Sequence, residues 1–235
     1  MTLPLRAISE DDDLLVVSKP SGLVSHPTKN GEMSSLIGRV RVYLGHGEGR
    51  LVNRLDRETS GVVLVAKRAE VASELGKILA AANVRKVYDA VVHGHVDGVL
   101  TIDAPLGRDA ASPVAIKDCV RADGAPARTV FRGVWRFARP DGDFTLVEVE
   151  PASGRKHQIR IHAAHAGHPI VGDKLYGGDE TIYLRFVSGQ MTEADQRQLL
   201  LPHHALHARE MQFVWRGKAW TFVAPPEDAF RQFVS

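Results

Sequence analysis

Asp56 is the residue whose surroundings in the sequence are best suited to chemistry. It lies between Arg54 and Arg57 in a short polar segment. A carboxylate among guanidinium groups is expected to stay ionised, because nearby positive charge favours its charged form. An ionised aspartate suits nucleophilic or electrostatic duty and makes a poor general acid. An isolated aspartate of this kind more often caps a turn and pairs with arginine at the surface, and the local residues leave both interpretations open.

The spacing around Asp56 predicts how the neighbouring side chains point. If residues 51–56 are extended, Arg54 and Asp56 share one face of the backbone, and Asn53 and Leu55 share the other. The small polar residues at 59–61 then predict a turn directly after the aspartate. A buried strand is expected at 62–66, where five apolar residues follow one another. The aspartate would therefore be presented by a loop that enters a core strand.

The local charge around this loop differs from the charge of the whole chain. The 235 residues have a formal net charge of +2, which does not by itself indicate a nucleic-acid partner. Between Arg39 and Arg68, however, seven basic residues accompany three acidic ones. Such a segment could form a phosphate-binding face or a solvated charged surface, and charge alone favours neither.

Two groups of histidines raise the question of a metal site. Neither group has the H-E-x-x-H spacing of a zinc-binding helix, and no carboxylate lies inside either run. Structural roles or contacts with a nucleic acid are therefore favoured, and no metal is expected. The glycine-rich run 45–49 precedes an extended segment, whereas a dinucleotide fingerprint follows a strand and opens a helix, so no cofactor is expected there either. The first group of histidines comprises His162, His165 and His168, and the second comprises His203, His204 and His207.

Hydrophobic periodicity predicts the elements that must position these residues. Helices are expected at 33–44, 68–82, 157–166 and 193–200. Strands are expected at 14–18, 62–66, 86–93, 206–215 and 219–223, with a hairpin formed by 128–137 and 144–150. Residues 97–127 are rich in turn formers and should hold only short strands.

Composition narrows the class of protein. The chain is 44% hydrophobic and 25% charged, which is typical of a globular domain and argues against disorder. Cys119 is the only cysteine, so no intrachain disulfide can form. The first 13 residues do not resemble a secretory signal, and no run approaches the length of a membrane span. We expect a cytoplasmic protein.

Several long blocks of the sequence resemble the RluA-type RNA pseudouridine synthases. The run N-R-L-D-R-E-T-S-G at 53–61 is similar to the H-R-L-D-x-x-T-S-G signature of that family. The run S-G-R-K-H-Q-I-R-I-H at 153–162 resembles its T-G-R-x-H-Q-I-R-x-H segment, and G-D-K-L-Y-G at 172–177 its G-D-x-x-Y-G extension. Similar blocks occur, in the order of the family, at 19–27, 86–94 and 206–208. Agreement over so many blocks is far more specific than any single motif.

The resemblance implies roles for individual residues. Asp56 would be the catalytic aspartate, Tyr88 the active-site tyrosine, and Arg160 the arginine that pairs with the aspartate. Arg54 would fill the space left by the flipped uridine. Further RNA contacts are expected from Arg57, Arg155, Lys156 and His157. His157 and Arg160 are one helical turn apart and could share a face.

The resemblance also implies an α+β fold, with a mixed, mainly antiparallel sheet flanked by helices and bisected by an RNA-binding cleft. Residues 1–235 would form a single catalytic domain without an S4 domain, acting as a monomer on a uridine in rRNA or tRNA. Asn53 stands where the family usually has histidine. We expect the chemistry to survive this change, and any difference to lie in local support or RNA preference. Two other functions stay open: a non-catalytic RNA-binding protein, and a hydrolase that cleaves glycosidic bonds with Asp56.

Overall fold

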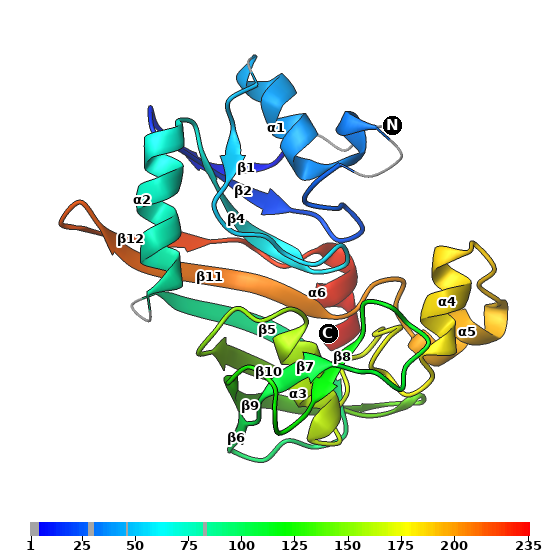
Figure 1. Cartoon of the computed structure of the whole chain (residues 1–235). Helices are drawn as coiled ribbons and strands as arrows, with labels where there is room; N and C mark the ends of the chain where they lie inside the picture. The colour runs from blue at the N-terminus through cyan, green and yellow to red at the C-terminus, as the bar shows by residue number, and fades with distance from the viewer. Residues whose placement is uncertain (1–4, 28–30, 46, 82–83) are drawn as a thin grey trace. The chain divides into compact units, whose positions relative to one another are not determined.

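The computed structural model describes residues 5–27, 31–45, 47–81 and 84–235 (Figure 1). The chain forms two compact units. The first unit comprises residues up to 87 together with 207–228, and the second comprises 88–206 together with 229–235. None of the described helices is long and apolar enough to cross a membrane.

The first unit is built on a sheet whose central strand is buried on both faces. Its strands are β1 (Ala7–Glu10), β2 (Leu14–Lys19), β3 (Arg50–Leu51), β4 (Ser60–Ala66), β11 (Leu206–Trp215) and β12 (Lys218–Val223). Strand β4 pairs antiparallel with β2 and β3 and parallel with β11. Every residue of β4 is buried, which explains why its sequence is an unbroken apolar run rather than an alternating one.

Helices cover this sheet. Helix α2 (Ala69–Ala80) buries Val71 and Leu75, which belong to one cluster with Val62 and Leu64 of β4. Helix α1 (Leu36–Leu44) follows a short 3-10 turn (Glu32–Ser34) and ends at Gly45, whose φ of 72° gives the left-handed C-cap. Residue 46, in the glycine-rich run, lies outside the described residues.

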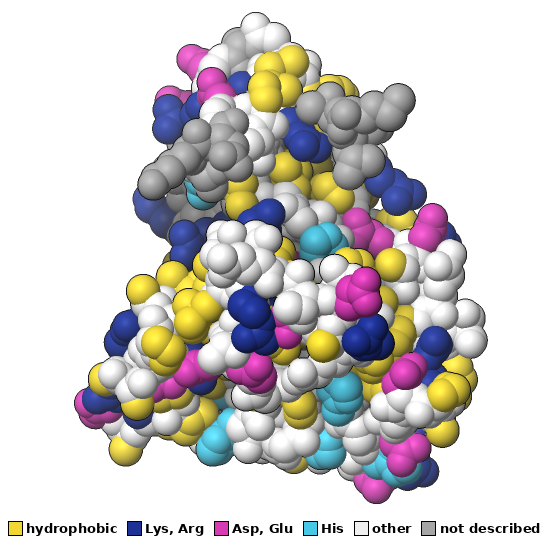
Figure 2. Space-filling model, turned by 90° about the vertical axis from the view of Figure 1, so that its right-hand side faces the viewer, with side chains coloured by type: hydrophobic (Ala, Val, Ile, Leu, Met, Phe, Trp, Pro, Cys, Tyr) yellow, Lys and Arg dark blue, Asp and Glu magenta, His cyan; other side chains and the backbone are white. Residues whose placement is uncertain are grey.

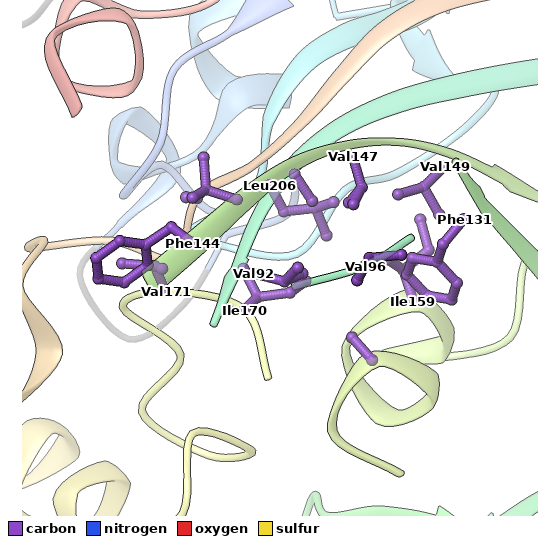
Figure 3. Close-up of a cluster of buried hydrophobic side chains, with 14 of the residues drawn as sticks. Val92, Val96, Phe131, Phe144, Val147, Val149, Ile159, Ile170, Val171 and Leu206 are labelled. Carbon is purple, nitrogen blue, oxygen red and sulfur yellow. The ribbon is translucent and has the colours of Figure 1, made fainter. Parts of the chain in front are cut away.

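In the second unit, neighbouring strands of the sheet run antiparallel in the order β5 (Arg85–His93), β10 (Gly142–Pro151), β9 (Arg128–Arg139) and β6 (Val99–Asp103). Strands β7 (Leu106–Arg108) and β8 (Asp118–Val120) form a separate hairpin. Helix α3 (Gln158–His165) contributes Ile159 to the core cluster of the second unit (Figure 3). Ala163 belongs to the same cluster. Helix α6 (Asp228–Val234) adds Phe230 and Phe233 to the same cluster. Helices α4 (Thr181–Val187) and α5 (Glu193–Leu199) are joined by hydrogen bonds from Arg185 to Asp195.

The α+β class and the mainly antiparallel pairing are confirmed, as are the predicted strands at 14–18, 62–66, 86–93, 206–215 and 219–223. The predicted helices and the hairpin are confirmed to within a few residues. The prediction of an extended segment over 51–56 is wrong, because the strand ends at Leu51 and a loop follows. Strand β1 and helices α4 and α6 were not predicted, since each is short and carries no long apolar period.

The strand ends early because a side chain takes over the hydrogen bonds of the backbone. The Val52 N–H still donates to the Leu64 carbonyl, at 2.9 Å. From the next residue, the Asn53 amide donates to the Val62 carbonyl (3.2 Å) and accepts from the Leu64 N–H (2.8 Å). The ladder of β4 is therefore satisfied although the backbone has turned away.

Candidate functional site

Asp56 lies in the loop 52–59, which joins β3 to β4 and is called the Asp56 loop below. Its side chain is half-buried, and the Thr59 N–H donates to the Asp56 carbonyl oxygen at 3.2 Å, closing the predicted turn. Arg54 and Arg57 are exposed on either side, and Leu55 is buried between them. Leu55 therefore anchors the loop in the core, while the charged side chains extend towards the surface.

Lys19 ties the Asp56 loop to the end of β2. Its side chain is fully buried, and its Nζ donates to the carbonyl oxygens of Pro20 (2.9 Å), Leu23 (2.8 Å) and Arg57 (3.0 Å). Burial lowers the pKa of Lys19 to about 7, although the charges of Glu227, Asp56 and Glu58 favour its ionised form. Since Arg57 directly follows Asp56, this bond to its carbonyl oxygen restrains the backbone next to the aspartate.

A buried histidine secures the other end of the loop. His207 Nε2 lies 2.9 Å from the Ala224 carbonyl, so this nitrogen carries the proton and donates. Its Nδ1 then accepts from the Ser60 hydroxyl at 2.8 Å. Burial lowers the pKa of His207, which favours the same neutral form. Next to it, Gly61 has φ +119°, and a Cβ there would lie 2.2 Å from the Ala208 carbonyl oxygen.

In the second unit, Arg160 forms a buried ion pair that the sequence did not reveal. Its Nε and Nη2 donate to the two carboxylate oxygens of Asp173, at 2.7 and 2.9 Å. Asp173 Oδ1 also accepts the backbone N–H groups of Leu175 (2.9 Å) and Tyr176 (3.0 Å). Burial opposes ionisation of Asp173, but the charge and hydrogen bonds of Arg160 outweigh it and hold the pKa below its ordinary value.

Tyr88 occupies a position suited to both packing and contact with a ligand. It lies on β5 opposite Val149 of β10 and is half-buried against the core cluster of the second unit. The apolar body of a tyrosine in such a position packs while its hydroxyl stays at the edge.

The candidate RNA-binding residues at 155–157 lie in the turn before α3. Gln158 holds this turn, because its Oε1 accepts from the Ser153 hydroxyl (2.6 Å) and from the Arg155 N–H (3.2 Å). Arg155 and Lys156 are exposed, and Lys156 Nζ lies 2.9 Å from an Asp118 carboxylate oxygen. His157 has a left-handed backbone with φ 56°, which turns the chain into the helix.

His157 and Arg160 share a face, as predicted, and both contact Tyr176. His157 Nδ1 lies 2.9 Å from the Tyr176 hydroxyl, and the Arg160 guanidinium carbon lies 5.0 Å from the centre of the Tyr176 ring. Burial is the main reason why the pKa of Tyr176 is raised, so its hydroxyl remains protonated.

Of the other histidines in the two groups, His162 and His168 make hydrogen bonds within the protein. His162 is fully buried between the Thr129 hydroxyl (2.8 Å) and the Ala104 carbonyl (2.9 Å). His168 Nδ1 lies 3.0 Å from the His93 carbonyl oxygen. Over the described part of the chain, no three histidine, cysteine or acidic side chains are grouped as metal ligands would be.

Asp56 thus belongs to the first unit, whereas Tyr88 and Arg160 belong to the second. Three buried residues that support them were not assigned a role from the sequence: Lys19, Asp173 and Tyr176. All three occur in blocks that resemble the family, but a charged residue in a motif does not by itself reveal that it is buried. Burial of these residues is decided by how distant segments of the chain pack together, which the motif does not show.

Comparison with known proteins agrees with these blocks. Residues 13–165 match the RNA pseudouridylate synthase family. A protein of Pseudomonas aeruginosa named ribosomal large subunit pseudouridine synthase D is 33% identical over 235 residues, covering 96% of this chain and 70% of the relative. An uncharacterized RNA pseudouridine synthase of Chloroflexus aurantiacus is 40% identical over 166 residues, covering 68% of this chain and 51% of the relative. An uncharacterized protein of Caenorhabditis elegans is 39% identical, and the match spans only 39% of its length.

Solved structures show the same fold. Human RNA pseudouridylate synthase domain containing 1 superposes with a TM-score of 0.76 at 22% identity, covering 96% of this chain and 85% of that protein. Human RNA pseudouridylate synthase domain containing 4 gives a TM-score of 0.73 at 23% identity, with coverages of 96% and 90%. Sequence and fold therefore agree, and this chain belongs to the RNA pseudouridylate synthase family.

Proposed function

We propose that this chain converts a specific uridine in RNA to pseudouridine, with Asp56 as the nucleophile. In this isomerisation the N-glycosidic bond breaks, the uracil turns over while bound, and its C5 is joined to the ribose carbon. No atom is gained or lost overall, so the reaction needs no redox partner. The observation that carries the proposal is that Asp56, inside the segment that matches the family, sits in a loop immobilised by Lys19 and Asn53.

A fixed loop favours this chemistry for a physical reason. A nucleophile held in an attacking position avoids the entropy cost of finding that position during the reaction. Lys19 bonds to the loop, and Asn53, which is part of the loop, bonds to β4. Ser60, the first residue of β4, is hydrogen-bonded to His207. Asp56 therefore extends from a backbone fixed on both sides.

Tyr88 and Arg160 complete the proposed machinery. Tyr88 would stack on the uracil and could help to remove the C5 proton, and Arg160 would keep Asp56 ionised and aimed. The bidentate pair with Asp173 uses Nε and Nη2 of Arg160. These two parallel hydrogen bonds fix the plane of the guanidinium. A guanidinium held in a fixed plane supports the proposal that Arg160 is part of the catalytic machinery.

RNA is the proposed partner, and rRNA or tRNA the proposed substrate class. A paired uridine must leave its helix before its glycosidic bond can be attacked, at a cost of a few kcal/mol, so loops and bulges are favoured. Arg54, Arg57, Arg155, Lys156 and His157 would contact this RNA. Residues 1–235 would act as one catalytic domain with a cleft for the RNA, as a monomer in the cytoplasm. The relative named for the large ribosomal subunit makes large-subunit rRNA the first substrate to test.

The activity is tested by release of tritium from RNA labelled at uridine C5. Wild-type protein should release tritium from at least one rRNA or tRNA transcript and leave pseudouridine in the product. Asp56→Asn should lower the rate at least ~10³-fold, the scale seen when a covalent nucleophile is removed. Asp12→Asn, an exposed carboxylate in the same unit, is the matched control and should match wild type. Free uracil among the products would indicate a hydrolase, and an unchanged rate for Asp56→Asn would refute its role.

The RNA contacts are tested separately by the salt dependence of binding. Arg155→Ala should weaken binding and lower the slope of log affinity against log salt by about 1, as expected for one lost phosphate contact. Lys156→Ala should have a smaller effect, because Lys156 must first leave Asp118, with which it forms an ion pair at 2.9 Å. Equal effects of the two substitutions would show that this ion pair does not persist in solution.

A further inference from the structure

The loop 173–176 makes an unusual number of directed bonds to the residues around it. Its first residue, Asp173, is 2% exposed and accepts four hydrogen bonds, two from Arg160 and two from the backbone of the loop itself. The backbone bonds fix the carboxylate relative to the loop. The two bonds from Arg160 then fix the plane of the guanidinium, because a bidentate pair permits only one orientation.

Tyr176, the last residue of this loop, holds three further groups. Its hydroxyl accepts from the Asp118 N–H at 3.3 Å and lies 2.9 Å from His157 Nδ1. Since the hydroxyl is protonated, it can donate to His157 Nδ1 in the tautomer that leaves this nitrogen without a proton. Its ring lies beneath the Arg160 guanidinium, 5.0 Å from centre to carbon, where a cation–π interaction is favourable. A single tyrosine thus contacts β8, the turn before α3, and the candidate catalytic arginine.

We propose that Asp173 and Tyr176 are positioning residues, which fix the Arg160 guanidinium for catalysis and tie it to the RNA-facing turn at His157. The inference rests on the proposed function and adds to it the residues that orient Arg160. The chemistry itself would stay with Arg160 and Asp56. Asp173 and Tyr176 act only through the groups that they hold.

Stability alone does not explain why this pair is buried. Burying a carboxylate and a guanidinium costs desolvation that their attraction often fails to exceed, and apolar residues of similar size are frequently as stable. The side chains of Arg160 and Asp173 are 8% and 0% exposed. An ion pair this deeply buried is therefore best accounted for by the geometry that it imposes on Arg160.

The kinetic test uses two substitutions that remove different parts of the arrangement. Asp173→Asn keeps the shape but turns an NH2 group or a neutral oxygen towards Arg160, and kcat should fall about 100-fold, since misplacement by about 1 Å has that effect. Tyr176→Phe keeps the ring and removes the hydroxyl, and kcat should fall about 5- to 10-fold. In both variants KM for the RNA should stay within about threefold of wild type. Tyr183→Phe, from the same apolar cluster, is the control and should retain wild-type kinetics.

An NMR readout on ¹⁵N-labelled protein separates this inference from the proposed activity. In wild type the Arg160 Nε–H should exchange slowly with water, because it is buried and bonded to Asp173. Asp173→Asn should accelerate that exchange at least about tenfold, and Tyr176→Phe should shift the His157 Nδ1 resonance. These results are expected whether or not any RNA tested is a substrate, so an inactive wild type would count against the proposed function alone.

Several outcomes would overturn the positioning roles. One is a Tyr176→Phe variant with unchanged kcat and an unchanged His157 resonance. Another is a rise in KM with kcat preserved in both variants, which would assign these residues to RNA binding. If Asp173→Asn fails to fold, Tyr176→Phe decides the question, because it preserves the packed ring and the ion pair.

Discussion

Lys19→Met should change how the stability of the first unit depends on pH. The substitution replaces a fully buried ammonium with an apolar chain of similar length. It leaves three carbonyl oxygens without their donor, at about 1–3 kcal/mol each, but it also removes the cost of burying a cation. These effects oppose one another, so the free energy of unfolding at a single pH is a poor test. The pH dependence of the difference in free energy of unfolding between wild type and Lys19→Met reports on the charge of Lys19 alone.

The sign follows from the two pKa values of Lys19. In the folded chain its pKa is lowered from 10.5 to about 7, so between these values the unfolded chain holds more protons. The free energy of unfolding therefore rises with pH across this window, because the buried Lys19 amine loses its proton in the folded chain. With a folded pKa of about 7, wild type should gain about 2 kcal/mol between pH 6 and pH 8.5 that Lys19→Met does not gain.

The assay is urea unfolding followed by tryptophan fluorescence. In a Trp135→Phe background the remaining tryptophans, Trp215 and Trp220, both report on the first unit. Lys77→Met, an exposed lysine of α2, serves as the control, and its stability difference from wild type should not change with pH. If the free energy of unfolding of wild type does not rise relative to that of Lys19→Met between pH 6 and pH 8.5, Lys19 is not a buried amine with a depressed pKa.

Three further predictions concern β4 and α2, and each is checked by chemical denaturation. Gly61→Ala should cost more than about 3 kcal/mol or prevent folding, because the new Cβ would lie 2.2 Å from the Ala208 carbonyl oxygen at φ +119°; near-wild-type stability would contradict that close approach. Gly76→Ala, inside α2 with open space around it, should instead stabilise by about 0.5–1 kcal/mol; a loss would show that the site is not open. Ser60→Ala should cost about 1–3 kcal/mol by leaving His207 Nδ1 buried without its donor, and a neutral result would argue against that hydrogen bond.

The pattern of apolar residues along the chain was sufficient to predict the main helices and strands. The apolar run of β4 and the helical period of α2 are properties of consecutive residues, and both were predicted close to their observed bounds. The extended prediction over 51–56 failed because periodicity cannot show that the Asn53 amide will replace two backbone groups. The same bonds give Asn53 a structural role in this chain, through an amide that both donates and accepts.

The candidate site was predictable in part. Asp56, Tyr88 and Arg160 were named from residue type, spacing and resemblance, and their catalytic roles remain predictions. The shared face of His157 and Arg160 followed from helical spacing and is confirmed through their common contact with Tyr176. The residues that hold these groups were not foreseen, because their partners lie far away along the chain.

The sequence by itself determined the α+β class, the family and the identity of the reactive groups, since these depend on the order and type of neighbouring residues. Only the tertiary structure decided which charges are buried. Lys19 meets the Asp56 loop across 38 residues of sequence, and Arg160 meets Asp173 across 13. Desolvation and hydrogen-bond geometry depend on distances in space, so the lowered pKa of Lys19 and the fixed plane of Arg160 exist only once the chain has folded.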